Sequence, residues 1–113
     1  MRVICKDILL AENAIMADSM YSRIMGLMFK KEMKKFDGLI LKPCYSIHTF
    51  FMRFKIDVVF LDRKDQVIKV IKNMKPWRVS WIYFRSNKVL ELNGGTIQAE
   101  LKTGDKVEII CTN

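Results

Sequence analysis

The chain has 113 residues, of which 50% are hydrophobic and 28% charged, which is typical of a globular protein and predicts a single domain over residues 1–113. No apolar stretch approaches the roughly 20 residues of a membrane span, and the N-terminus lacks a signal-peptide pattern, so we expect a cytoplasmic protein. The formal net charge is +8, but Lys and Arg are scattered along the chain, which permits nucleic-acid binding without favouring it.

The first part of the chain predicts short strands. Residues 1–5 are β-branched enough for an initial strand, and residues 8–17 predict a second strand around a turn at Glu12 and Asn13. A polar stretch ends at Gly38 and leads into a strand over residues 39–41. Pro43 closes that strand, because proline cannot donate a hydrogen bond to a sheet.

One helix is predicted over Ser19 to Phe29. Asp18 and Ser19 offer an N-cap for it. Apolar side chains then recur at the spacing of one helix face, at Met20, Ile24, Leu27 and Met28. Gly26 weakens a helix by roughly 1 kcal/mol relative to alanine, so we expect it to allow close packing.

The second half of the chain predicts further strands. Residues 56–61 and 67–71 flank a charged loop and predict a hairpin, and the first of these strands is apolar at consecutive positions, so both its faces should be buried. A strand over residues 89–92 ends at a strong turn signal, Asn93-Gly94-Gly95. We expect a one-turn helix from Thr96 to Leu101 and a final strand over residues 106–110.

These elements together predict a mainly β (α+β) fold. Many short strands with one helix and a short helical turn favour a compact, mainly antiparallel β-barrel or sandwich.

Several short motifs along the chain occur in a specific order and spacing. They are Arg23-x-x-Gly26-Leu27-Met28, Gly38-Leu39-Ile40, His48-Thr49, Met52-Arg53-Phe54-x-Ile56-Asp57-Val58-Val59-Phe60, Leu90-Glu91-Leu92 before Gly95, and Gly104-Asp105. From Ile15 to Ile109 the array resembles the family named "domain of unknown function 192". Lys55 stands where that family often has proline, and Asn93-Gly94 replaces a Pro-Ala-like pair. The resemblance implies a small β-rich fold with one helix and supplies no activity, substrate or cofactor.

Five polar residues form a candidate pocket, Arg23, His48, Thr49, Asp57 and Glu91. An aspartate that borders an apolar run is costly to bury unless it is paired, so Asp57 is either a structural hydrogen-bond anchor or part of a site. Arg23 is a surface residue, the partner of Asp57 or Glu91 in a salt bridge, or an anion clamp beside His48. His48 can serve as an acid, a base or a ligand near neutral pH.

Catalytic and metal sites are not favoured. Cys44 lies four residues before His48, but Pro43 argues against a helix that would place both on one face. One histidine and three dispersed cysteines do not form a zinc pattern, and these cysteines fit reduced thiols better than disulfides. We therefore expect no catalytic residues, no metal and no cofactor.

An aromatic stretch follows Pro76. Trp77, Trp81, Tyr83 and Phe84 lie near two arginines and could stack on nucleic-acid bases, but core filling is the simpler expectation. Trp77 is the exception, because it follows a proline in a loop, and we expect it to be exposed and to contact a partner.

No complete catalytic set emerges, so the sequence favours a protein that is not an enzyme. The leading interpretation is a cytoplasmic binding or accessory module, with an unidentified small ligand or protein as partner. The first alternative is a small enzyme or small-anion-binding protein that uses Arg23, His48, Asp57 and Glu91 in one pocket. The second is a nucleic-acid-binding protein that uses its basic, aromatic surface.

Overall fold

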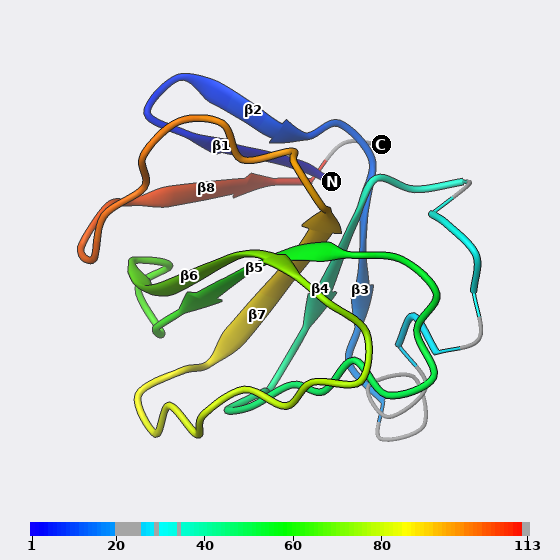
Figure 1. Cartoon of the computed structure of the whole chain (residues 1–113). Coiled ribbons are helices and arrows are strands. Elements are labelled where there is room, and N and C mark those ends of the chain that lie inside the picture. Colours follow the sequence, from blue (N-terminus) through cyan, green and yellow to red (C-terminus); the bar gives the residue numbers. More distant parts are fainter. Residues whose placement is uncertain (20–25, 29, 34, 112–113) are drawn as a thin grey trace.

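Eight strands in two sheets make up the regular structure of the described part of the chain, in a computed structural model that describes residues 1–19, 26–28, 30–33 and 35–111 (Figure 1). The strands are β1 (Arg2–Cys5), β2 (Ile8–Ala11), β3 (Ala14–Ala17), β4 (Gly38–Leu41), β5 (Ile56–Leu61), β6 (Val67–Met74), β7 (Lys88–Asn93) and β8 (Val107–Ile110). The strands predicted from the sequence are therefore confirmed, with ends that differ by a few residues.

The sheets are mostly antiparallel, as predicted. One sheet has the order β2-β1-β8, and the other has the order β3-β4-β7-β5-β6. Every pairing is antiparallel except that between β3 and β4, which is parallel. The two sheets do not close into a barrel, because β3 and β6 remain the edges of the five-stranded sheet.

The expected helices are not supported. Most of the predicted helix from Ser19 to Phe29 lies outside the described residues, and its described part at residues 26–28 is a turn. The expected one-turn helix from Thr96 to Leu101 is wrong, because this segment is an irregular loop. The amide of Ile97 donates to the carboxylate of Asp57 at 2.8 Å, which ties this loop to β5. No helix among the described residues is long and apolar enough to cross a membrane.

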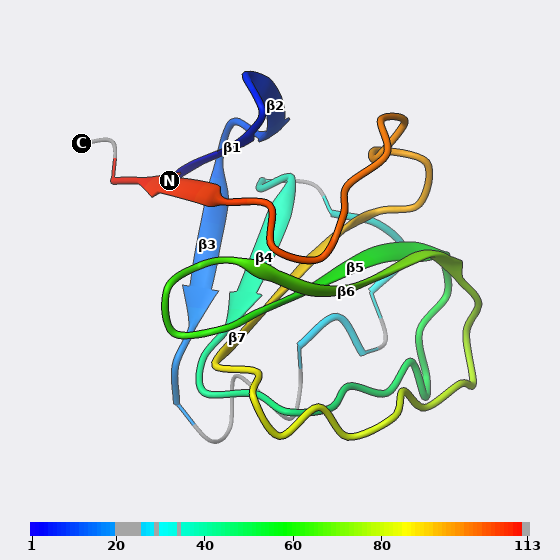
Figure 2. The ribbon, with the colours of Figure 1, turned by 90° about the vertical axis from the view of Figure 1, so that its left-hand side faces the viewer.

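Both faces of the five-stranded sheet are buried. All six residues of β5 are buried, as their consecutive apolar positions predicted. One face, with Val59 and Leu90, packs against the three-stranded sheet through Val3 and Val107. The other face, with Val58 and Phe60, is covered by loops instead of a sheet, through residues such as Ile47. Figure 2 shows these loops beneath the five-stranded sheet, away from the three-stranded one.

Candidate functional site

Two long loops lie side by side on the loop-covered face, at the lower edge of Figures 1 and 2. Residues 42–55 connect β4 to β5, and residues 75–87 connect β6 to β7; we call them the paired loops. They run antiparallel, with a bridge between His48 and Val79. The amide of Ser80 donates to the carbonyl of Ile47 at 2.8 Å. The two loops therefore form one surface.

Thr49 holds the paired loops together. Its side chain is fully buried. Its hydroxyl donates to the carbonyl of Lys75 at 2.6 Å and accepts from the amide of Arg78 at 2.8 Å. Its own carbonyl accepts from the amide of Trp77 at 2.9 Å, and its amide donates to the carbonyl of Arg78 at 2.8 Å. Each of these bonds fixes the backbone of residues 75–78, and Trp77 adopts a positive φ of 64° there.

Large hydrophobic side chains are concentrated on the outside of the paired loops. Of the 13 that are exposed in the described part of the chain, eight lie in these loops. They are six aromatic residues, Tyr45, Phe50, Phe51, Trp77, Trp81 and Phe84, with the aliphatic Val79 and Ile82. We call these eight side chains the aromatic face.

The exposure of these rings corrects the expectation of core filling. Trp81 is 79% exposed and Phe84 is 84% exposed, because the loop that carries them runs outside both sheets. Only Tyr83 turns inward, with its ring 4.6 Å from that of Phe60. Trp77 is 56% exposed, as expected, and lies against Phe51 with ring centroids 4.7 Å apart. Contact between Trp77 and a partner stays a prediction.

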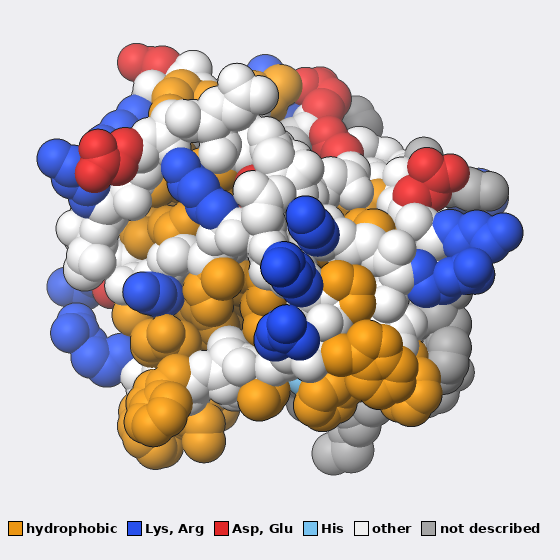
Figure 3. Space-filling view, viewed as in Figure 1, with side chains coloured by type: hydrophobic (Ala, Val, Ile, Leu, Met, Phe, Trp, Pro, Cys, Tyr) orange, Lys and Arg blue, Asp and Glu red, His pale blue; other side chains and the backbone are white. Residues whose placement is uncertain are grey.

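The paired loops carry only positive charge. They contain six exposed or partly exposed Lys and Arg residues and no Asp or Glu, namely Lys42, Arg53, Lys55, Lys75, Arg78 and Arg85. Figure 3 shows hydrophobic side chains along the lower edge of the molecule and several Lys and Arg side chains above them. Six of the 20 basic residues of the sequence therefore lie in the two loops that carry the aromatic face.

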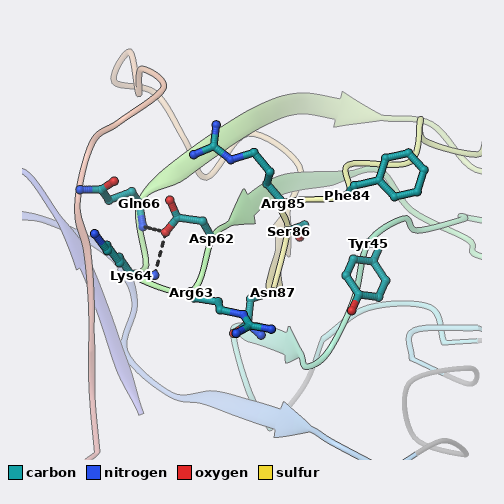
Figure 4. Close-up of a pocket in the computed structure, with 9 residues that line it drawn as sticks. All are labelled: Tyr45, Asp62, Arg63, Lys64, Gln66, Phe84, Arg85, Ser86 and Asn87. Carbon is teal, nitrogen blue, oxygen red and sulfur yellow. Dashed lines mark hydrogen bonds between the residues drawn. The ribbon is translucent and has the colours of Figure 1, made fainter.

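A cavity of about 390 Å³ borders the aromatic face at Tyr45 and Phe84. Figure 4 shows these two rings on one side of the cavity and Asp62, Lys64 and Gln66 on the other. Burial acts to raise the pKa of the Asp62 carboxyl, but hydrogen bonds from the amides of Gln66 and Lys64, with the nearby Arg85 cation, lower it overall. The remaining lining residues are Arg63, Arg85, Ser86 and Asn87.

Asp57 lies away from the paired loops. It is fully buried, and its carboxylate accepts hydrogen bonds from the amides of Asn73 at 2.8 Å, Gly95 at 3.2 Å and Ile97 at 2.8 Å. These contacts join the end of β6 to the turn after β7. The arrangement is that of a structural anchor.

Glu91 is buried on the opposite face of the same sheet. Asp57 pairs with Leu92 and Val58 pairs with Glu91, so alternation along the strands sends the two carboxyl groups to different sides. Glu91 is 4% exposed, and no hydrogen bond from a described residue contributes to the pKa of its carboxyl. Burial raises its pKa to about 8.

The structure does not bring the predicted pocket residues to one place. His48 and Thr49 lie in the paired loops, Asp57 and Glu91 lie on opposite faces of the sheet, and Arg23 lies outside the described residues. The Nδ1 atom of His48 accepts from the amide of Phe50 at 3.2 Å, and the two rings stack at 5.0 Å. A ligand-binding role for these residues stays a prediction.

The sequence analysis did not select most of the aromatic face. It named Trp77 as a contact residue but missed residues such as Phe50, Phe51 and Ile82. The signal that could have found them is the combination of large apolar residues, no strand periodicity and no carboxylate within 42–55 and 75–87.

Comparison with known proteins gives one consistent family. Residues 6–109 match the DUF192 family, described as "Uncharacterized ACR". A UPF0127 protein of Pyrococcus horikoshii is 36% identical over 98 residues, which cover 81% of this chain and 83% of that protein. A UPF0127 protein of Pyrococcus furiosus is 32% identical over 98 residues, with coverage of 81% and 82%. The resemblance found in the sequence is thereby confirmed.

Solved structures share the fold. A protein of unknown function from Novosphingobium aromaticivorans matches with a TM-score of 0.71 and 24% identity over 85% of this chain and 74% of that one. A protein of Sinorhizobium meliloti, described with a proposed role as a transcription regulator, matches with a TM-score of 0.73 and 21% identity over 95% and 89%. Both identities are below 25%, so these likenesses concern the fold alone.

Proposed function

The chain belongs to the DUF192 family, and we propose that it is a binding module, without catalytic activity, whose aromatic face engages an anionic partner. It acts as a single domain over residues 1–113. One observation carries the proposal: the two loops that hold eight of the 13 large hydrophobic side chains exposed in the described chain also hold six cations and no carboxylate.

Apolar surface of this extent is a feature of binding sites. Isolated exposed hydrophobic residues are common on proteins, but grouped ones mark an interaction surface, and here the rings of Phe50 and Phe51 both lie against that of Trp77. The six Lys and Arg residues around it would attract and orient an anionic partner. The bonds made by Thr49 hold the loops in place before binding, which lowers the entropy lost on association.

The polar groups of the earlier candidate pocket support a binding role more than catalysis. Acid–base catalysis needs a side chain within hydrogen-bond reach of a substrate. The buried oxygens of Asp57 and Thr49 instead accept bonds from backbone amides. Cys5, Cys44 and Cys111 are not joined by disulfides, which supports action in the cytoplasm.

Chromatography on immobilised heparin, used as a polyanion, tests the proposal. We expect the protein to bind at low salt and to elute at about 0.3–0.5 M salt, because contacts between Lys or Arg and the anionic groups of a polyanion weaken steeply as salt rises. Lys75→Gln with Arg78→Gln should elute much earlier. The matched control removes two exposed lysines outside the paired loops, Lys31 and Lys102.

Equal shifts for the two double variants would show that net charge, not the paired loops, causes retention, and would refute the proposed surface. Elution of the wild-type protein at low salt would refute the anionic partner.

A further inference from the structure

We propose that the anionic partner is the surface of a lipid bilayer, into which the aromatic face inserts. This inference rests on the proposed function and names the partner class for the same surface. Three observations carry it, which are the kinds of side chain that protrude, their place on the molecule, and the charge around them.

The protruding side chains suit hydrocarbon better than nucleic-acid bases. Trp81 and Phe84 are the most exposed large hydrophobic side chains of the described chain, and Val79 follows at 65%. Aromatic rings can stack on bases, but the branched side chains of Val79 and Ile82 have no flat face for stacking. The boundary between headgroups and acyl chains accepts both kinds, and Trp and Tyr are enriched there.

The aromatic face lies where a flat surface can reach it. The paired loops form an outer edge of the molecule in two perpendicular views (Figures 1 and 2). The hydrophobic side chains spread along that edge (Figure 3). All eight side chains are already exposed, so none has to leave the core of the protein to enter a bilayer.

The charge distribution selects an anionic bilayer. Exposed Arg78 and Lys75 belong to the same short segment as Trp77 and Val79, and Arg85 follows Phe84 directly. Such cations can bind lipid phosphate and carboxylate groups while the rings insert beside them. The paired loops contain no Asp or Glu that would be repelled by the membrane or desolvated on insertion.

The test is sedimentation with large unilamellar vesicles of two compositions, phosphatidylcholine alone or with roughly 30 mol% phosphatidylserine, at about 0.1 M salt. We expect binding to the anionic vesicles and at least about tenfold weaker binding to the neutral ones. Trp81→Ser with Phe84→Ser should weaken binding to anionic vesicles by about tenfold or more. The matched control is Ile8→Ser with Leu9→Ser, which removes two exposed apolar side chains from β2, outside the paired loops.

Tryptophan fluorescence reports insertion directly. Trp77 and Trp81 are the two tryptophans of the chain, and both lie on the aromatic face. We expect a blue shift with anionic vesicles in the wild type, and a residual shift from Trp77 in Trp81→Phe. An unchanged emission maximum for vesicle-bound protein would overturn insertion.

The outcomes separate this inference from the proposed function. Retention on heparin without sedimentation by anionic vesicles would overturn the lipid partner and leave an anionic partner of another class. Binding of oligodeoxythymidine that depends on Trp81 and Phe84, without vesicle binding, would identify that class as single-stranded nucleic acid and would also overturn the inference. Equal binding to both kinds of vesicle, or an equal loss in the β2 control, would overturn it as well. Failure of both heparin and vesicle binding would overturn both proposals.

Discussion

The five-stranded sheet buries a carboxyl group on each of its faces, and the two groups have opposite surroundings. On the face under the three-stranded sheet, Asp57 accepts three backbone hydrogen bonds. On the loop-covered face, Glu91 lies between Leu39 and Val58, and no hydrogen bond from a described residue contributes to the pKa of its carboxyl. Burial is nearly complete in both cases, at 0% and 4% exposure. Equal burial therefore says little about a carboxyl group until its partners are known.

The same contrast applies to the two faces as a whole. The face between the sheets is closed by strands, whose backbone groups pair with one another. The loop-covered face is closed by loops, in which side chains such as Thr49 provide hydrogen-bond partners for backbone amides and carbonyls. The proposed binding surface lies on the outside of this second layer. Four variants can break or sharpen the comparison.

The largest effect is expected for Asp57→Asn. An asparagine oxygen can keep part of the interaction, but its amide nitrogen cannot accept from a backbone amide. Loss of a buried, charged acceptor should cost about 3 kcal/mol, which lowers the melting temperature by ten degrees or more in a domain of this size. Thermal unfolding followed by circular dichroism measures the change. A melting curve that matches or exceeds that of the wild type would contradict the anchoring role of Asp57.

Glu91→Gln should change the free energy of unfolding in the opposite direction to Asp57→Asn, in favour of the variant. Its pKa in the folded state is about 8, against an ordinary value of 4.5. Between these values the folded protein holds a proton that the unfolded chain has released, so wild-type stability falls as pH rises through this window. The contribution of the Glu91 proton to wild-type stability is fully present below pH 4.5 and is lost above pH 8.

Glutamine mimics the protonated carboxyl at every pH. We expect the difference in unfolding free energy between the variant and the wild type to grow by roughly 2 kcal/mol from pH 5 to pH 7, in favour of the variant. Urea titrations at several pH values measure this difference. A constant difference across the range would indicate that Glu91 is ionised in the folded state and has a partner.

Thr49→Val should have an intermediate effect. The substitution keeps the shape of the side chain but removes the hydroxyl, so the amide of Arg78 and the carbonyl of Lys75 each lose a partner. We expect a loss of about 1–2 kcal/mol. Hydrogen exchange of the Arg78 amide should accelerate more than that of amides in β5. Uniform acceleration across both would show that Thr49 supports the whole fold instead of the paired loops.

Trp81→Ser with Phe84→Ser should change stability least. Removing a buried aromatic side chain costs about 3–5 kcal/mol, but these two are 79% and 84% exposed. We expect the unfolding free energy to stay within about 0.5 kcal/mol of the wild type. A loss of several kcal/mol in a urea titration would show that the rings pack into the fold and would remove them from the binding surface.

Much of the framework follows from local patterns in the sequence. The apolar run of β5, the charged turn before β6 and the glycine pair after β7 are strong signals because each depends only on neighbouring residues. The family motifs are also readable from the chain alone, and the match over residues 6–109 confirms them. The one-turn helix expected at Thr96 is absent, and the loop found there is tied to β5 by the hydrogen bond from the Ile97 amide to Asp57, 40 residues away.

The sequence by itself determined that this is a strand-rich chain with an excess of positive charge, and it singled out Asp57 as either a structural anchor or part of a site. Only the tertiary structure decided that Asp57 and Glu91 face opposite sides, because strand register is a matter of pairing between distant segments. It also decided that residues 42–55 and 75–87 lie together, which turns scattered cations and separate aromatic residues into one surface. Whether a large ring is in the core or in solvent depends on what covers it, and here nothing within the described chain covers Trp81 or Phe84.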